Sequence, residues 1–394
     1  MAPSLSREFL LAVACSVWPP SDRRTEAIRA AAASPLDWDH FLQVVRRHRI
    51  VGLVHDGLTR SSSAVPSDIR REIGGLATTL VRQNLELAAE AVRLQHLFAE
   101  KDLPVMFFKG VSLAILAYGN LGLRHSRDID ILVAPEILAP ASVLLERAGY
   151  RQHQPPPEFS TSQLQMWTYR CKEVRYIHDA KQIEVELHFR LFDNPRLMVG
   201  IPATNLSRTV PITDGISLRT FGDDDLFAYL CTHGAVDRWF RLKWLADIGA
   251  LLVLQQEGGV ERLYRAAEAR GAGQSSAQAI LLCHRLLGTA IPDQLITMFK
   301  KITTVRWLEA IAMKALTADK EPSELPFGTT WSSLARFLLN RDWLYCLAEL
   351  KVSLISPVDI LTLPLPKQLR ALYPFLRLPF WLWRKCIRRT SSVP

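Results

Sequence analysis

Residues 128–133, with the sequence Asp-Ile-Asp-Ile-Leu-Val, decide the fold because they read as a buried strand that carries two carboxylates. Apolar and β-branched side chains favour a strand. Residues two apart in a strand leave the same face, so Asp128 and Asp130 point one way and their apolar neighbours point into the core. Aspartate is depleted in strands, which makes two in so apolar a run unusual.

A metal ion would explain this pair. Adjacent carboxylates repel each other, and burial of even one uncompensated ion costs several kcal/mol. A divalent cation bound by Asp128 and Asp130 would offset that cost. Such oxygen ligands suit magnesium, which also binds nucleotide phosphates. The pair therefore predicts a magnesium site, and the alternative is an exposed edge strand with two solvated aspartates.

A later strand at residues 183–189, Ile-Glu-Val-Glu-Leu-His-Phe, is predicted from the alternation of apolar and polar residues. Glu184, Glu186 and His188 share one of its faces. One glutamate beside the two aspartates would complete a three-carboxylate site that holds two metal ions ~3.5–4 Å apart. We expect Glu186 to take this role, with Glu184 as the substitute. An ordinary surface strand is the alternative.

A phosphate-binding turn is predicted where an apolar strand meets a short helix. Gly110 would let a phosphate approach the backbone, and the helix N-terminus would direct amide hydrogens towards it. Lys109 adds positive charge at this turn, and Ser112 adds a hydroxyl. Arg124 and Arg127, just before the aspartates, are further candidates for phosphate binding. Both arginines would equally suit a solvated loop.

The order of predicted elements indicates an α+β fold. Residues 5–100 and the chain from residue 223 onward show helical spacing of apolar residues. Between them, strands at residues 104–108, 128–133 and 183–189 alternate with helices at residues 112–118 and 135–149. This order suits a small mixed β-sheet covered by helices. We therefore expect an N-terminal helical region at 1–100, a core at 101–222 and a C-terminal helical region at 223–394.

Composition restricts the partners and the compartment. The 394 residues carry a net charge of +9, which favours anionic partners such as nucleotides, nucleic acid or a lipid surface. The six cysteines form no CxxC pair, which argues against a zinc site and against a disulfide framework. We therefore expect reduced thiols in a cytoplasmic protein.

Two apolar segments near the ends of the chain require separate interpretation. Residues 9–15 are too short an apolar run for a signal peptide, so we expect an amphipathic first helix. No run approaches the ~20 apolar residues of a membrane span. The aromatic and basic residues 372–385 would suit a membrane surface or would cover a groove on the helical region. We favour the second interpretation.

Several of these segments together carry a family resemblance. The Phe-Lys-Gly turn at residues 108–110, the helix end at Tyr118-Gly119, Arg124 and residues 128–133 resemble a family of uncharacterised bacterial nucleotidyltransferases. That family belongs to the DNA polymerase β-like nucleotidyltransferase superfamily. Residues 185–191, Val-Glu-Leu-His-Phe-Arg-Leu, are similar to its later acidic motif, which favours Glu186 over Glu184. The resemblance covers roughly residues 35–255.

The resemblance implies transfer of a nucleoside monophosphate from a nucleoside triphosphate, expected to be ATP, to an acceptor hydroxyl, with release of pyrophosphate. It implies two Mg²⁺ ions, replaceable by Mn²⁺, on three metal ligands, namely Asp128, Asp130 and Glu186. Five residues would bind the nucleotide: Lys109, Gly110, Ser112, Arg124 and Arg127. Three more are possible substrate contacts, namely His188, His233 and Asp247.

The sequence allows alternatives for the turn, for the acceptor and for the function. Val111 follows Gly110, where the superfamily usually has serine or glycine, so either Ser112 replaces the missing hydroxyl or the turn holds the phosphate by its backbone alone. The acceptor is a small molecule, a peptide, a protein side chain or an RNA end. A catalytically silent nucleotide-binding or regulatory module, or an RNA-end-modifying enzyme, is the alternative function.

Overall fold

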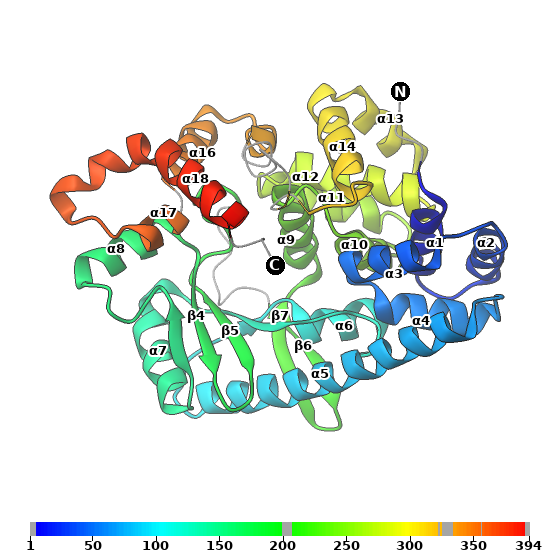
Figure 1. The fold of residues 1–394 in the computed structure, drawn as a ribbon, viewed down its shortest axis with the longest axis horizontal. Coiled ribbons are helices and arrows are strands. Elements are labelled where there is room, and N and C mark those ends of the chain that lie inside the picture. Colours follow the sequence, from blue (N-terminus) through cyan, green and yellow to red (C-terminus); the bar gives the residue numbers. More distant parts are fainter. Residues whose placement is uncertain (1–4, 199–206, 322–323, 325–333, 356, 391–394) are drawn as a thin grey trace.

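A mixed five-stranded sheet lies against a large helical body in the computed structural model of the chain (Figure 1). The structure describes residues 5–198, 207–321, 324, 334–355 and 357–390. The α+β fold expected from the sequence is confirmed, because helices cover both faces of this sheet.

The sheet places the two carboxylate-bearing strands side by side. Its order is β1 (Met106–Phe107), β2 (Asp128–Leu132), β5 (Ile183–His188), β4 (Glu173–His178) and β3 (Arg151–Gln154). Strands β2 and β5 are parallel, and every other pair in this sheet is antiparallel. The two strands with alternating polar residues are therefore confirmed, whereas the apolar run at 104–108 forms a strand of only two residues.

One face of the sheet is apolar and packs on the long helix α5 (Ser67–Ala99) and on α7 (Leu138–Arg147). Ile131 and Val185 of the sheet share a buried cluster with Leu94 of α5, and all three side chains are almost fully buried. Figure 1 shows α5 running the length of the molecule beneath the sheet. This packing leaves the acidic side chains of β2 and β5 on the opposite face.

The remaining helices form one body above that polar face. The N-terminal helices are α1 (Arg7–Ser16), α2 (Asp22–Ala32), α3 (Trp38–His48) and α4 (Val51–Ser61). The later helices are α9 (Asp223–Val236), α10 (Leu242–Val253), α11 (Gly259–Ala269), α12 (Gly273–Leu282), α13 (Asp293–Lys301) and α14 (Thr303–Leu316), with a π-helical turn at Cys283–Leu287. Both groups contribute to one continuous apolar core. The domain boundaries at residues 100 and 222 stay a prediction.

Two further elements complete the surroundings of the sheet. Helix α6 (Gly110–Tyr118) follows β1 and packs on α10. The hairpin of β6 (Ser207–Thr213) and β7 (Ile216–Phe221) contacts β1 and α5.

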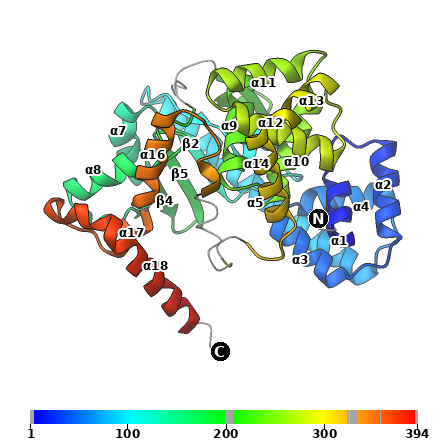
Figure 2. The ribbon, with the colours of Figure 1, turned by 90° about the horizontal axis from the view of Figure 1, so that it is seen from above.

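The C-terminal segment packs on the far end of the sheet. Helix α16 (Trp343–Leu354) is followed by α17 (Pro357–Thr362), a 3₁₀ turn (Lys367–Leu372) and α18 (Tyr373–Thr390). Tyr373 is buried in a small apolar cluster with Trp167 of α8 (Thr161–Arg170). Helix α18 then projects from the body (Figure 2), and its Phe375 and Trp383 are exposed.

Tyr373 packs against α8 rather than against the N-terminal or later helices, so the expected covering of a groove on the helical region stays a prediction for residues 372–385. Several side chains of that stretch, such as Trp381 and Arg384, lie outside the described ones. Within the described part of the chain, no helix is both long enough and apolar enough to cross a membrane.

A buried carboxylate on α5 anchors the apolar side of the sheet. Glu90 accepts hydrogen bonds from Arg93 of the same helix (Nε–Oε2 2.9 Å), Tyr150 (2.7 Å) and Lys181 (2.5 Å). Although burial raises its pKa, these partners outweigh burial and lower the pKa of Glu90 from 4.5 to about 2. The ionised carboxylate therefore stabilises the contact between α5 and the sheet.

We expect Glu90→Gln to lower the free energy of unfolding by roughly 2 kcal/mol at pH 7. Because the folded-state pKa is depressed, the stabilisation is present above pH 4.5 and is lost as the pH falls towards 2. The deficit in urea denaturation should therefore shrink as the pH falls through that window. Glu86→Gln, at an exposed site one turn earlier, should match wild type. A deficit that did not change with pH would contradict this explanation.

Candidate active site

The sheet register brings the predicted carboxylates together. Asp130 lies directly opposite Glu186, and Asp128 lies opposite Glu184, because β2 and β5 are parallel and in register at these positions. Ligand atoms of Asp130, Glu186 and His188 all lie within 4.8 Å of one another. Three side chains from two strands that are far apart in the sequence thus converge on one point, and all three are buried.

Positively charged side chains of the protein lie against two of the carboxylates. Lys109 Nζ lies 2.6 Å from Asp130 Oδ1, and His188 Nε2 lies 3.2 Å from the same oxygen. Arg175 Nη2 lies 3.1 Å from Glu186 Oε1. Burial raises the pKa of Asp130, but the charges of Lys109 and His188 outweigh it and hold the pKa well below its usual range.

Asp128 lacks such a partner. Its carboxylate makes no ion pair with another described residue, although it lines the same site. Burial, followed by the charges of Asp130 and Glu186, raises the pKa of Asp128 to about 6. A divalent cation held by Asp128, Asp130 and Glu186 would supply the missing positive charge, and their oxygens are the ligands that Mg²⁺ prefers. The residues therefore fit a metal site.

The turn before α6 has the geometry for an anion. Gly110 has φ of 60°, a left-handed conformation that favours glycine, and a Cβ atom there would lie 3.4 Å from the backbone oxygen of Asp128. No side chain caps this helix N-terminus within the described ranges, so its first amides can bind a phosphate. The Ser112 hydroxyl instead donates to the carbonyls of Phe107 (2.8 Å) and Lys109 (3.0 Å), which holds the turn.

Arg124 and Asp247 form a buried ion pair. Arg124 Nε lies 3.0 Å from Asp247 Oδ2, and the Tyr118 hydroxyl donates to Asp247 Oδ1 at 3.0 Å. Asn84 of α5 donates to the backbone carbonyl of Arg124 at 2.7 Å. This network joins the loop before β2 to α6, α10 and α5. It therefore fixes the position of the aspartates relative to the helical body.

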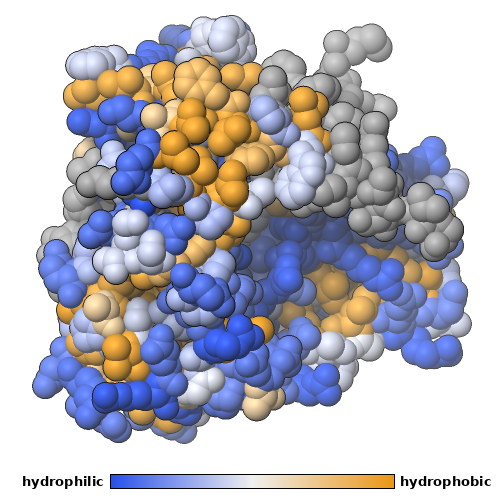
Figure 3. All heavy atoms as spheres, turned by 60° about the vertical axis from the view of Figure 1, so that its left-hand side comes forward, coloured by the Kyte–Doolittle hydropathy of each residue, from blue (hydrophilic) through white to orange (hydrophobic). Residues whose placement is uncertain are grey.

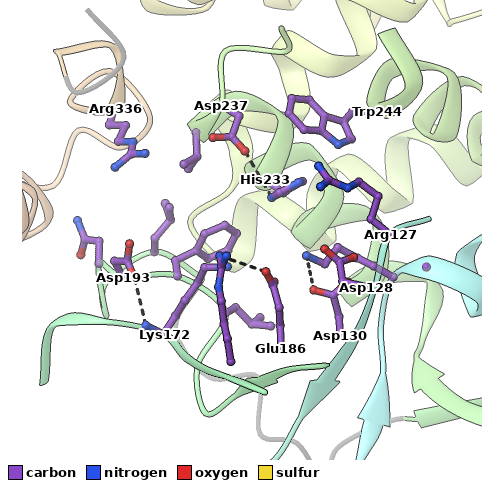
Figure 4. A pocket seen from close by; sticks show the side chains of 18 of the residues that line it. Arg127, Asp128, Asp130, Lys172, Glu186, Asp193, His233, Asp237, Trp244 and Arg336 are labelled. Atoms are coloured by element: carbon purple, nitrogen blue, oxygen red, sulfur yellow. Dashed lines mark hydrogen bonds and ion pairs between the residues drawn. The ribbon is translucent and has the colours of Figure 1, made fainter. Parts of the chain in front are cut away.

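A cavity of about 340 Å³ opens over the polar face of the sheet. Figure 3 shows a recess in the surface with mainly hydrophilic walls, and Figure 4 shows the cavity's side chains pointing towards one another. The predicted residues that line it are Lys109, Gly110, Arg124, Arg127, Asp128, Asp130, Glu186 and His233. Ser112, Glu184, His188 and Asp247 are absent from its lining.

His188 lies behind the carboxylates, where Nε2 is also 3.4 Å from both Glu173 Oε2 and Glu186 Oε2. His233 faces the cavity from α9, stacks on Tyr229 with a centroid distance of 5.9 Å and meets Trp244 edge-on at 5.2 Å. Glu184 is turned towards His153, with Nε2–Oε1 at 3.2 Å. The cavity therefore contains Glu186 but not its substitute.

Several charged residues of the cavity were not predicted. They are Arg49, Lys172, Arg175, Asp193, Asp237, Lys243, Arg336 and Glu349. Arg175 alternates with Glu173 along β4, so the pattern Glu-Val-Arg-Tyr could have indicated a further strand with a charged face. The others lie on separate loops and helices, and no local pattern links them to the carboxylates.

Comparison with known proteins gives one family. The model of the family described as "Uncharacterised nucleotidyltransferase" matches residues 34–288, which is more than half of the chain. No curated protein matches. The matched residues include β2, β5 and α6, whereas the cavity residues Arg336 and Glu349 lie beyond them.

We expect Asp247→Ala to lower the free energy of unfolding by about 3 kcal/mol, because it leaves the Arg124 guanidinium buried without its partner. A double variant, Arg124→Met with Asp247→Leu, should recover part of this loss because no unpaired charge remains. Urea denaturation measures both effects. Asp179→Ala, which breaks an exposed pair with Arg151, should change stability little. Equal stability of Asp247→Ala and wild type would refute the structural role.

Proposed function

The chain belongs to the family of uncharacterised nucleotidyltransferases, and from this premise we propose that it is a metal-dependent enzyme of the DNA polymerase β-like superfamily. It transfers a nucleoside monophosphate from ATP to an acceptor hydroxyl and releases pyrophosphate. The observation that carries the proposal is the placement of Asp130 opposite Glu186, with Asp128 in the same cavity. A protein without catalysis has little reason to keep three carboxylates so close.

Asp128 and Asp130 would hold both metal ions, and Glu186 would hold the ion on the acceptor side. When bound, two Mg²⁺ or Mn²⁺ ions supply Lewis-acid stabilisation of the phosphates and lower the pKa of the acceptor hydroxyl. His188 is buried behind the carboxylates. Its Nε2 atom contacts both Asp130 and Glu186 and so positions these two side chains. It does not reach the cavity itself.

The triphosphate lies against the N-terminus of α6. The first amides of that helix and the Arg127 side chain face the cavity on the side of the aspartates. Lys109 lines the same cavity, and its ammonium group contacts Asp130. Ser112 shapes the turn by binding its carbonyls, and Arg124 supports the loop through Asp247. Anions are favoured at a helix N-terminus, and Lys109 adds a point charge.

The transfer itself is an in-line displacement. The acceptor oxygen bonds to the α-phosphorus, the bond from that phosphorus to the oxygen of the β-phosphate breaks, and pyrophosphate leaves with the electron pair. The acceptor proton passes to water. Positioning and charge stabilisation dominate catalysis of such reactions. The residues around the cavity provide both.

The direct test is pyrophosphate release from each nucleoside triphosphate with Mg²⁺ and a cell extract as the source of acceptor, followed by mass spectrometry for a product that gains a nucleotide. We expect Asp128→Asn and Glu186→Gln to lose ~10³-fold in rate, because metal binding stabilises the transition state by several kcal/mol. The matched control is Glu184→Gln, which alters the same face of β5 outside the cavity and should keep its activity.

An active Glu186→Gln protein, or loss of activity in Glu184→Gln alone, would refute this assignment of the third carboxylate. If the wild-type protein releases no pyrophosphate with any nucleotide and any extract, a catalytically silent module would be favoured. A modifier of RNA ends predicts RNA binding that weakens steeply with salt, so weak binding that is indifferent to salt would remove that alternative.

Metal binding can be measured without turnover. We expect Mg²⁺ at 100 times its dissociation constant to raise the free energy of unfolding by about 2.7 kcal/mol, because the ion binds only the folded protein. Chelation with EDTA should reverse the gain, and the same ionic strength of NaCl should not reproduce it.

The Asp128→Asn variant should lose this response. Without metal it should be more stable than wild type at pH 7, because burial and two neighbouring carboxylates oppose the charge of Asp128. An unchanged Mg²⁺ response in the variant would place the metal elsewhere.

A further inference from the structure

The C-terminal segment, residues 334–390, exposes a large share of the molecule's apolar surface. Twenty large apolar side chains are exposed among the described residues, and eleven of them lie between residues 334 and 383. Single exposed apolar side chains are normal, whereas their concentration in one segment marks an interaction surface. Figure 3 brings this end of the molecule forward and shows hydrophobic side chains gathered above the recess.

Helix α16 turns an apolar stripe towards solvent. The stripe consists of exposed residues at spacings of four, three and four, namely Trp343, Leu347, Leu350 and Leu354. Tyr345 and Glu349, on the opposite side of the helix, are buried and line the cavity. Amphipathic helices ordinarily turn their apolar stripe towards the core. The exposed stripe of α16 is therefore available to a partner.

Helix α18, which contacts α16, has the same arrangement. Tyr373 is buried, and Arg377 on the same side pairs with Asp359 at 2.9 Å. Helical spacing places four exposed residues together on the other side, namely Phe375, Pro379, Leu382 and Trp383. Phe375 is 78% exposed and Trp383 is 53% exposed, on a helix that leaves the body of the molecule (Figure 2). Both helices thus present apolar and aromatic side chains to solvent.

The same end of the chain carries most of its positive charge. Residues 334–394 contain ten Lys or Arg and three Asp or Glu, so they supply +7 of the net charge of +9. Two of the three acidic residues, Glu349 and Asp359, are buried. The sequence of α18 contains five basic residues and no acidic one. The exposed surface of this segment is therefore both apolar and basic.

An anionic lipid bilayer matches both properties. Trp and Phe side chains favour the boundary between headgroups and acyl chains, and Lys and Arg bind anionic headgroups. Nucleic acid would also attract the cations and stack on aromatic rings, but it offers no apolar volume for the exposed leucines of α16. Of the two partners that the sequence allows for residues 372–385, the exposure of Phe375 and Trp383 favours the membrane surface.

We propose that the exposed stripes of α16 and α18 dock the protein on the surface of an anionic lipid bilayer, with α18 lying among the headgroups. Tyr345, Glu349 and Val352 of α16 line the cavity from the side opposite the stripe. A helix with its side chains is ~10–12 Å across, so docking holds the cavity about one helix diameter from the lipid. The docking helices lie beyond the family match, which ends at residue 288.

Co-sedimentation of the full chain with vesicles tests the docking without turnover. Vesicles of phosphatidylcholine alone would be compared with vesicles of phosphatidylcholine and phosphatidylglycerol in equal amounts. We expect at least ~10-fold stronger binding to the anionic vesicles, because each basic residue near such a surface strengthens binding roughly fivefold. This excess should fall as NaCl is added, since salt screens the attraction. No binding to either vesicle, or equal binding to both, would overturn the proposal.

Removal of the apolar anchors should weaken binding. We expect Phe375→Ser with Trp383→Ser to lose at least ~10-fold in binding to the anionic vesicles, because both side chains leave water in the docked state. The matched control is Leu254→Ser with Trp307→Ser, which removes two equally exposed side chains from α14 and the end of α10 and should bind as wild type does. Thermal denaturation checks that each variant is folded. Full binding by the first variant, or an equal loss in the control, would overturn the proposal.

A second pair of variants separates local charge from net charge. Arg388→Gln with Arg389→Gln removes two charges from α18 and should weaken binding to the anionic vesicles at least ~10-fold, with little effect on phosphatidylcholine vesicles. Lys300→Gln with Lys301→Gln removes two charges from an exposed site on α13 and should change binding little. A loss of equal size in both variants would overturn the proposal, because net charge alone would then drive binding.

Other partners give different outcomes. Binding of single-stranded RNA without binding of vesicles would make the surface a nucleic-acid site and overturn the proposal. Dimers in sedimentation equilibrium that Phe375→Ser with Trp383→Ser abolishes, again without vesicle binding, would assign the surface to a second copy of the chain. Membrane docking is independent of nucleotidyl transfer. A protein that binds anionic vesicles but releases no pyrophosphate would therefore support the docking and count only against the proposed enzyme.

Discussion

The confinement of three carboxylates to one buried patch is the constraint on which the rest of this structure depends. Like charges in a medium of low dielectric repel strongly, so positive groups must lie close by. Lys109 lies against Asp130 and Arg175 against Glu186, from the two opposite sides of the patch. His188 lies beneath it. The turn before α6 and the neighbouring strand β4 are therefore as necessary to the patch as the strands that carry the carboxylates.

The two faces of the sheet have different roles in forming this patch. The apolar face binds α5 and α7 through a cluster that excludes water, which keeps β2 and β5 in register. Register matters because a shift by one residue would turn the acidic side chains towards α5 and the apolar ones into the cavity. On the polar face, the pair of Arg124 and Asp247 ties the loop before β2 to α10. The helical body is thus held over the carboxylates at a fixed distance.

The sequence predicted what depends on short-range periodicity. The strands at 128–133 and 183–189 and their polar faces are visible from alternation alone, and the α+β class follows from the order of elements. The preference for Glu186 needed the family motif, since Glu184 has the same periodicity and only the tertiary arrangement turns it towards His153. The partner of Arg124 is 123 residues away, and the hydroxyl of Ser112 binds carbonyls that the sequence cannot place. No sequence pattern around Glu349 indicated that it lines the cavity, because its helix reaches the cavity only through the folding of the C-terminal segment.

In the proposed function, charge balance also links the metal and the nucleotide at one site. Without metal, Lys109 is the principal counter-ion of Asp130, and burial makes its loss costly unless another cation takes its place. A divalent ion at the carboxylates would provide that replacement, but it would also repel the nearby ammonium group. A triphosphate at the N-terminus of α6 would give Lys109 a new anionic partner within reach of the same turn. In the proposed function, each of the two ligands therefore removes the electrostatic obstacle to the other, and Lys109 is the residue through which they are coupled.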